Sequence, residues 1–192
     1  MSIHFKCELV LPHWLESFVN DWSEPLETSE QRMHLAVSLS AENVRHGTGG
    51  PFGAIVVEDR SSHLIAVGVN LVTTAKLSIA HAEVVAISLA QSANNNWNLG
   101  HESDVQLVTS CEPCAMCFGA VPWSGVSSLL WGASKDDAEA AGFDEGDKPV
   151  EWAQLLENRN IRTKGGILAE EAAAVLKNYA KKAGVIYHPG QL

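Results

Sequence analysis

The chain has 192 residues, of which 46% are hydrophobic and 19% are charged, a length that suits one domain with a sizeable buried core. Its formal net charge of −10 argues against a polyanionic partner, because proteins that grip nucleic acid through phosphates need a basic face. No apolar run approaches the roughly 20 residues that cross a bilayer. Residues 1–16 mix polar with apolar side chains, unlike a signal peptide, so we expect a cytoplasmic protein without a membrane partner.

The first part of the sequence predicts two helices and then a β-hairpin. Leu11–Trp22 suits a short helix, and Thr28–Gln31 fits a capping box that opens a second helix, with Gly47 as its C-cap. The apolar face of this second helix comprises Met33, Ala36, Val37, Ala41 and Val44. Residues 52–58 and 63–70 read as strands, and the short polar turn between them makes the pair antiparallel.

Beyond the hairpin, helices and strands alternate, which predicts parallel crossovers in a mixed sheet with helices on both faces. The expected elements are a buried helix (80–91), a strand (105–109), a helix (114–121), a strand (126–131), a strand (161–163) and a helix (169–182). Ligands gather at the carboxyl ends of the parallel strands in such sheets. The helices that carry His81 and Cys114 would begin there.

Two segments together predict an open zinc site. The imidazole of His81 and the thiolates of Cys114 and Cys117 can hold one zinc ion and leave its fourth position for water. Zinc lowers the pKa of a bound water from about 16 to about 7, and Glu83 stands close enough in sequence to take the proton. An open site with a carboxylate that does not bind the metal is typical of hydrolysis.

Local structure explains why these residue types suit that chemistry. Pro113 fits the first turn of a helix, which would put Cys114 and Cys117 on one face of the opening turn. There the positive end of the helix dipole favours thiolates. His81 and Glu83 can address one site only if it lies off the end of their helix, so we place His81 in its first turn.

Cys111 leaves an alternative open, because Cys111 and Cys114 also form a Cys-x2-Cys pair. With Cys111 as a fourth ligand the zinc would be closed and purely structural. A redox-active pair is a further alternative, but it would not need His81 and Glu83. Cys7 is isolated, and we expect it to be inert.

The combination His-x-Glu with Pro-Cys-x-x-Cys resembles that of the zinc nucleobase deaminases. The chain is similar to the cytidine deaminase-like superfamily over about Met33 to Tyr187, and within it to the bacterial and plant guanine and guanosine deaminases. The segments that carry the likeness are 50–54 (GPFGA), Asn70, 81–83 (HAE), 109–117 (TSCEPCAMC) and 141–145 (AGFDE). The resemblance implies an α/β fold, the cytidine deaminase-like α/β/α sandwich with a five-stranded mixed sheet.

The resemblance also implies a function and the residues that perform it. Zinc bound to His81, Cys114 and Cys117 would support hydrolysis of guanine to xanthine and ammonia, with Glu83 as the main proton carrier and Glu145 as a second acid. The implied substrate-binding groups are the amide of Asn70, the backbone N–H of Ala82, and the rings of Phe52, Phe143 and Trp123. A homodimer is implied as well, with residues 1–30 as an N-terminal extension outside the likeness and 31–192 as the deaminase domain.

Ordinary structural roles remain for several of these residues. Phe52 begins a strand and suits a core position, Asn70 suits a turn, and Glu145 lies in an acidic stretch typical of a solvated surface. Other functions also stay open: deamination of cytosine, guanosine or an ammeline-type aminotriazine, a tRNA adenosine deaminase, or a non-enzymatic zinc domain with four ligands. The net charge of −10 counts against the tRNA enzyme, which needs a basic surface.

Overall fold

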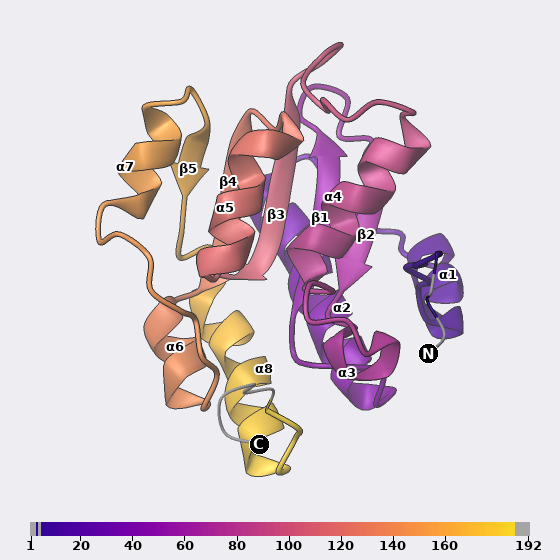
Figure 1. The fold of residues 1–192 in the computed structure, drawn as a ribbon, viewed down its shortest axis with the longest axis vertical. Coiled ribbons are helices and arrows are strands. Elements are labelled where there is room, and N and C mark those ends of the chain that lie inside the picture. Colours follow the sequence, from indigo (N-terminus) through magenta and orange to yellow (C-terminus); the bar gives the residue numbers. More distant parts are fainter. Residues whose placement is uncertain (1–2, 4, 187–192) are drawn as a thin grey trace.

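The computed structural model describes residue 3 and residues 5–186, which form five strands and eight helices (Figure 1). In chain order the elements are α1 (His13–Asn20), α2 (Ser29–Arg45), β1 (Gly53–Glu58), β2 (Leu64–Val69), α3 (Val72–Ala75), α4 (Ala82–Ala93), β3 (Val105–Cys111), α5 (Ala115–Ser124), β4 (Ser128–Ala133), α6 (Lys135–Ala140), α7 (Trp152–Glu157), β5 (Arg162–Lys164) and α8 (Ala169–Lys181). Among the described residues, every helix is too short or too polar to traverse a bilayer. The expected helices and strands all form, with ends shifted by up to three residues.

The strands make one mixed sheet in the order β2-β1-β3-β4-β5, which confirms the predicted α/β architecture. The hairpin partner β2 and the central strand β3 both run antiparallel to β1, whereas β4 and β5 continue parallel to β3. The short turn after β1 permits the antiparallel pair, and α5 supplies the crossover that parallel neighbours need. The carboxyl ends of β3 and β4 therefore meet at one edge of the sheet, where α5 and α6 begin (Figure 1).

Two hydrophobic cores lie on opposite faces of the sheet because successive strand residues point to opposite sides. In β1, Ile55 and Val57 belong to the core shared with α2 and α8, while Ala54 and Val56 belong to the core shared with α4. Every residue of β3 is buried, as expected for a central strand covered on both faces. Figure 1 shows α4 and α5 side by side on one face of the sheet.

Helix α2 begins as predicted but is more buried than its pattern indicated. Thr28 and Gln31 form the expected capping box, and Gly47 follows the helix in the left-handed region with φ 64°. Ala41, expected on the core face, is exposed instead. Polar residues that the apolar pattern cannot find, among them Ser40 and Asn43, are buried through hydrogen bonds to backbone carbonyls.

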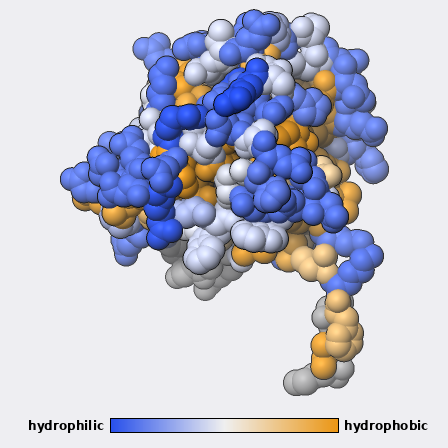
Figure 2. Space-filling view, turned by 90° about the horizontal axis from the view of Figure 1, so that it is seen from above, coloured by the Kyte–Doolittle hydropathy of each residue, from blue (hydrophilic) through white to orange (hydrophobic). Residues whose placement is uncertain are grey.

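The sequence reading missed three short helices, α3, α6 and α7, each of four or six residues. Helices this short show too few turns for a 3.6-residue pattern to appear. Their places are nevertheless important, because α3 follows β2 and α6 follows β4 at the edge of the sheet where both motif helices begin (Figure 1). Seen from above in Figure 2, the surface is mainly hydrophilic, with small apolar areas between polar side chains and one thin arm that projects from the body.

The buried guanidinium group of Arg32 links several elements at the end of the sheet where β3 begins, opposite the edge where α5 and α6 begin. Arg32 is 4% exposed and uses all five of its N–H donors. Its Nε donates to the Leu26 carbonyl at 2.7 Å, and its two terminal nitrogens reach Asp59, Gln106 and Ser62. This network joins α2 to the ends of β1 and β3, so it ties the sheet to the helix layer beneath it.

Replacing Arg32 by Met should lower the free energy of unfolding by about 3 kcal/mol, because Asp59 would keep a partly buried charge without its main partner. Urea denaturation followed by circular dichroism measures the difference. Arg45→Met is the matched control, since Arg45 is exposed and its one ion pair among the described residues is with Glu42 on the same helix. Equal stabilities of the Arg32→Met variant and the native chain would contradict the structural role of the network.

Candidate active site

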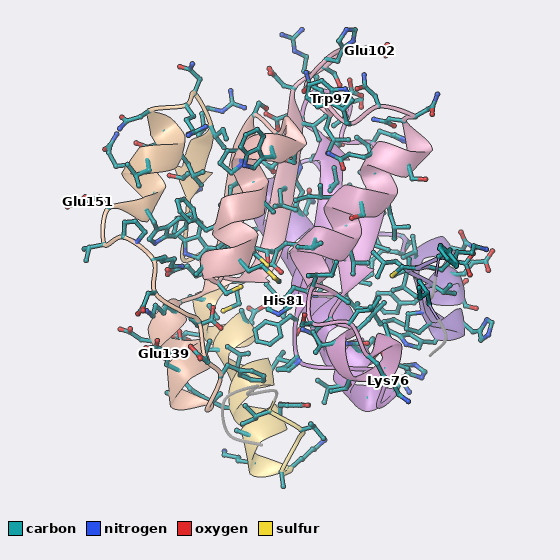
Figure 3. All side chains as sticks on the ribbon, in the orientation of Figure 1. Lys76, His81, Trp97, Glu102, Glu139 and Glu151 are labelled. Atoms are coloured by element: carbon teal, nitrogen blue, oxygen red, sulfur yellow. The ribbon has the colours of Figure 1, made fainter. Side chains whose placement is uncertain are left out.

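The predicted metal ligands converge on one point at the carboxyl edge of β3. The Nδ1 atom of His81 and the sulfurs of Cys114 and Cys117 all lie within 4.8 Å of one another. Nδ1 is 3.5 Å from the Cys114 sulfur and 3.6 Å from the Cys117 sulfur. In Figure 3, His81 lies near the middle of the molecule, at the start of α4, with sulfur atoms close by.

These distances fit zinc. A tetrahedral ion with Zn–N of about 2.05 Å and Zn–S of about 2.3 Å separates nitrogen from sulfur by about 3.6 Å. One imidazole and two thiols are also a donor set that zinc prefers. His81, Cys114 and Cys117 therefore form a zinc-binding site whose spacing matches the ion without rearrangement.

Both ligand segments are helix starts, but α4 begins two residues later and α5 one residue later than the sequence indicated. His81 is the N-cap of α4 rather than a residue of its first turn. Cys114 is the N-cap of α5, so Pro113 precedes that helix instead of opening it. Neither N-cap side chain makes the capping hydrogen bond that Ser, Thr, Asp or Asn would make there. Both side chains are therefore left free to bind metal.

The electrostatics of the two helix starts favour a thiolate at Cys114. A hydrogen bond from the Cys117 thiol, with further help from His81, lowers the pKa of Cys114 to about 4 despite its burial. Among the described residues, Cys111 stands outside the ligand cluster. Its sulfur lies 3.6 Å from the Ser134 carbonyl, and burial raises the pKa of its thiol well above the usual value. This geometry disfavours the four-ligand alternative.

A cavity opens beside the ligand cluster and collects residues from six parts of the chain. It is lined by Gly50, Phe52, Asn70, Val72, Thr73, His81, Glu83, Glu112, Cys114, Phe143, Asp144, Glu145 and Val185. Seven of these positions were predicted as site residues from the sequence, namely Phe52, Asn70, His81, Glu83, Cys114, Phe143 and Glu145.

Two buried carboxyl groups face this cavity. Glu83, the second residue of α4, is 6% exposed, and Glu145 is 5% exposed. Burial, followed by the negative charge of Cys114, raises the pKa of Glu83. Burial, with the negative charges of Cys114 and Glu83, likewise raises the pKa of Glu145 to about 8. The surface role that its acidic neighbours suggested for Glu145 is therefore wrong.

Asn70 is fixed as a donor toward the cavity. Its side-chain oxygen accepts from the N–H of Gly50 at 3.4 Å and from the N–H of Val72 at 3.3 Å, which leaves its amide NH2 for a ligand. Ala82 is fully buried and is not part of the cavity lining among the described residues. As the first residue of α4, however, it has a backbone N–H without a carbonyl partner inside the helix.

Aromatic rings form one wall of the cavity. Phe52 and Phe143 meet edge to face with ring centroids 4.8 Å apart, and Tyr179 stacks behind Phe143 at 5.9 Å. Trp123 does not join them. It is 80% exposed near the carboxyl end of α5 and lines a separate groove with Leu155, so its predicted place at the substrate is wrong for this chain.

The sequence reading missed several residues at the site. Val72 and Thr73 come from the unpredicted helix α3, and Val185 comes from the segment after α8. Glu112 could have been found, because it stands between two cysteines of the motif. Lys148, whose ammonium lies 2.6 Å from the Glu112 carboxylate, gave no signal in an acidic stretch.

Comparisons with known proteins agree with this geometry. A family model described as the cytidine and deoxycytidylate deaminase zinc-binding region matches residues 26–133. Guanine deaminase of Bacillus subtilis is 44% identical over 122 residues, which cover 60% of this chain and 75% of that protein.

Solved structures match over almost the whole chain. Guanine deaminase from Nitrosomonas europaea has a TM-score of 0.87 and 41% identity, covering 94% of this chain and 100% of that chain. A structure of NE0047 in complex with 2,6-diaminopurine also has a TM-score of 0.87, at 44% identity over 94% of this chain and 96% of that one. The chain therefore belongs to the cytidine and deoxycytidylate deaminase family of zinc-dependent hydrolytic deaminases.

Proposed function

We propose that this deaminase converts guanine and water to xanthine and ammonia. The observation that carries the proposal is a pair of buried acids, Glu83 and Glu145, in one aromatic-walled cavity beside the zinc ligands. A relative that is 44% identical is a guanine deaminase, and a structural neighbour binds 2,6-diaminopurine. Both observations favour a purine that carries an amino group.

Each residue has a distinct task in this reaction. Zinc, which His81, Cys114 and Cys117 would hold, would supply a Lewis acid that makes water acidic enough to lose a proton near neutral pH. Glu83 accepts that proton and passes it to N3 of the ring as oxygen attacks C2. The departing amino group needs one more proton, which Glu145 can supply as a general acid; as the C2–N bond breaks and ammonia leaves, the C2 hydroxyl returns a proton to Glu145 and becomes the carbonyl of xanthine.

The cavity favours a neutral base over a charged nucleotide. Among the described lining residues, four are acidic (Glu83, Glu112, Asp144 and Glu145) and none is Lys or Arg. Away from the zinc ligands, a phosphate would meet acidic side chains and no lysine or arginine of the described lining, so nucleotide substrates such as deoxycytidylate are disfavoured. The amide of Asn70 can donate to an acceptor on the ring edge, and the rings of Phe52 and Phe143 can contact its faces.

Two copies of the chain are proposed to form a homodimer through the surface of α5 and α7. Trp123 is 80% exposed and Leu155 is 41% exposed, and both line a groove with Phe118, Pro122 and the polar residues Asn158 and Arg159. Exposed apolar side chains that gather on one surface mark interaction sites in soluble proteins. Trp123 would then contact the second copy instead of the cavity of its own chain.

The assignment of residues 1–30 as an N-terminal extension and 31–192 as the deaminase domain remains a proposal. The family match begins at residue 26, close to that boundary. Leu15 and Leu26 nevertheless pack into the same core as α2, so the extension would be fastened to the domain. The described cysteines are free thiols, which suits the cytoplasm, and the net charge of −10 does not favour a nucleic-acid partner.

An ammonia-release assay on zinc-loaded protein tests the substrate. With guanine, guanosine, adenine, cytosine, cytidine and ammeline presented separately, guanine should give the highest kcat/KM and yield xanthine. Glu83→Gln should keep zinc and lose about 10,000-fold in kcat, because the main proton carrier is gone. A higher kcat/KM for any other compound would replace guanine as the substrate, and a Glu83→Gln variant at native rates would remove the role of Glu83.

Glu145→Gln should reduce kcat by about 100-fold with zinc content unchanged, since an amide cannot donate the last proton.

The same substitution should also change the pH dependence of stability. The pKa of Glu145 lies near 8 in the folded chain, above its ordinary value of 4.5, so stability present below about pH 4.5 is lost as the pH rises toward 8. After removal of zinc by a chelator, Glu145→Gln should melt at a higher temperature than the native chain at about pH 9, but not at about pH 4. Identical melting temperatures of the variant and the native chain at both pH values would show that Glu145 is not desolvated.

Cys111→Ser should retain one zinc ion per chain, because Cys111 lies outside the ligand cluster and bonds to the Ser134 carbonyl, which a hydroxyl can also do. Cys117→Ser is the matched control and should lose the metal. Metal content measured by mass spectrometry on dialysed protein compares the two. Loss of zinc from Cys111→Ser would restore the closed, four-ligand site.

A further inference from the structure

Lys148 is a buried ammonium that the proposed reaction does not use. Its side chain is only 3% exposed, although lysine is almost never fully buried unless it is paired. It lies three residues after Glu145 in the connection between α6 and α7, a stretch that runs along the edge of the cavity. The burial of this lysine therefore needs a structural or functional explanation.

Two of the three partners of Lys148 lie in a distant part of the sequence. Its Nζ atom is 2.6 Å from the carboxylate of Glu112 and donates to the carbonyl of Pro113 at 2.5 Å. The same ammonium stands over the ring of Trp152, 4.4 Å from its centroid. Two of the three contacts thus fall on the segment that carries the zinc ligand Cys114.

Glu112 is itself held in place, so it can serve as an anchor. Its second carboxylate oxygen accepts from the backbone N–H of Lys135 at 3.3 Å. Its own N–H donates to the Ala133 carbonyl at 2.8 Å, at the end of β4. The Lys148 ammonium is therefore attached to a carboxylate whose position is set by the sheet.

The connection that carries Glu145 needs such an attachment. Residues 143–149 form neither helix nor strand, and Gly142 and Gly146 flank Glu145 with φ of 100° and 67°. One backbone contact fastens the Glu145 residue, because its carbonyl accepts from the N–H of Ala115 at 2.9 Å. Lys148 supplies a second attachment to the same segment, three residues further on.

We propose that Lys148 is a positioning residue: by binding Glu112 and the Pro113 carbonyl, it fastens residues 143–148 to the zinc-ligand segment and holds the carboxyl of Glu145 beside the metal. The inference rests on the proposed function, in which Glu145 donates the last proton. The ammonium also lowers the pKa of Glu145, although burial raises it by more. The charge of Lys148 therefore acts on Glu145 as well as on the segment that its hydrogen bonds fasten.

A double-mutant cycle on the zinc-loaded protein tests this proposal. Lys148→Met should lower kcat by about 100-fold with little change in KM, since a displaced acid affects the transition state more than ground-state binding. In the Glu145→Gln background the same substitution should cost little, because the group that it positions is already gone. Lys148→Arg should recover most of kcat, since a guanidinium can reach both oxygen partners. Lys135→Met is the matched control on α6; its side chain is half-exposed, and kcat should not change.

Hydrogen exchange of the zinc-loaded proteins gives a readout that does not depend on turnover. Peptides that cover residues 142–150 should exchange faster in Lys148→Met than in the native chain, whereas Lys135→Met should leave them unchanged. Unaltered hydrogen exchange in Lys148→Met would overturn the proposal, whichever substrate the enzyme uses. The measurement can be made at low temperature, so it also works for a variant of reduced stability.

The outcomes separate this inference from the proposed function. An equal loss of kcat from Lys148→Met in both backgrounds would overturn the positioning role alone and make the ion pair purely structural. A native rate for Glu145→Gln would overturn the task of Glu145 together with that of Lys148. A native rate for Lys148→Met, with Glu145→Gln impaired, would leave the reaction scheme intact and refute the positioning role.

Discussion

The site depends on the meeting of two helix N-termini at one edge of the sheet. His81 and Cys114 are the N-caps of α4 and α5, and both have extended backbone that turns the side chain away from the helix axis. Their imidazole and sulfur consequently face each other at 3.5 Å although they are distant in sequence. The positive ends of both helix dipoles point to the same place, so thiolates and a bound anion are favoured there.

This arrangement lowers local stability but leaves the side chains of His81 and Cys114 available to bind metal. Neither N-cap side chain makes a capping hydrogen bond, a contact usually worth about 1 kcal/mol. Part of the loss at α5 is offset from outside, because the free N–H of Ala115 donates to the carbonyl of Glu145. The same hydrogen bond thus completes the helix start and places the second acid, which couples the metal segment to the acid that the reaction requires.

The sequence predicted what depends on spacing and residue type, and it missed what depends on distant packing. The ligand triad and Glu83 were found because only a few residue types can hold zinc, and the sheet was found because β1 and β3 are mainly apolar. The resemblance to known deaminases found Glu145 and Asn70, which local composition would have assigned to a solvated surface and a turn. It also placed Trp123 at the substrate, although the carboxyl end of α5 points that side chain to solvent.

Contacts between residues far apart in the sequence could not be predicted, because they leave no local pattern. Lys148 and Glu112 lie far apart in sequence, and a single lysine among acidic residues reads as a surface charge. The start of α4 was misjudged by two residues and that of α5 by one, the latter because proline fits just before the N-cap as well as within the first turn. An error of this size matters here, because it decides whether a ligand lies within a helix or at its free end.

The two ends of the sheet show a division between stability and chemistry. At the end where β3 begins, Arg32 satisfies all five donors with Asp59, Gln106 and their neighbours, so that polar cluster is complete and rigid. At the end where β3 finishes, Glu83 and Glu145 are buried with raised pKa values and face a cavity. Buried acids with raised pKa values in a cavity are poised to exchange protons with a ligand. A complete network at one end can hold the fold while the other end keeps its acids available.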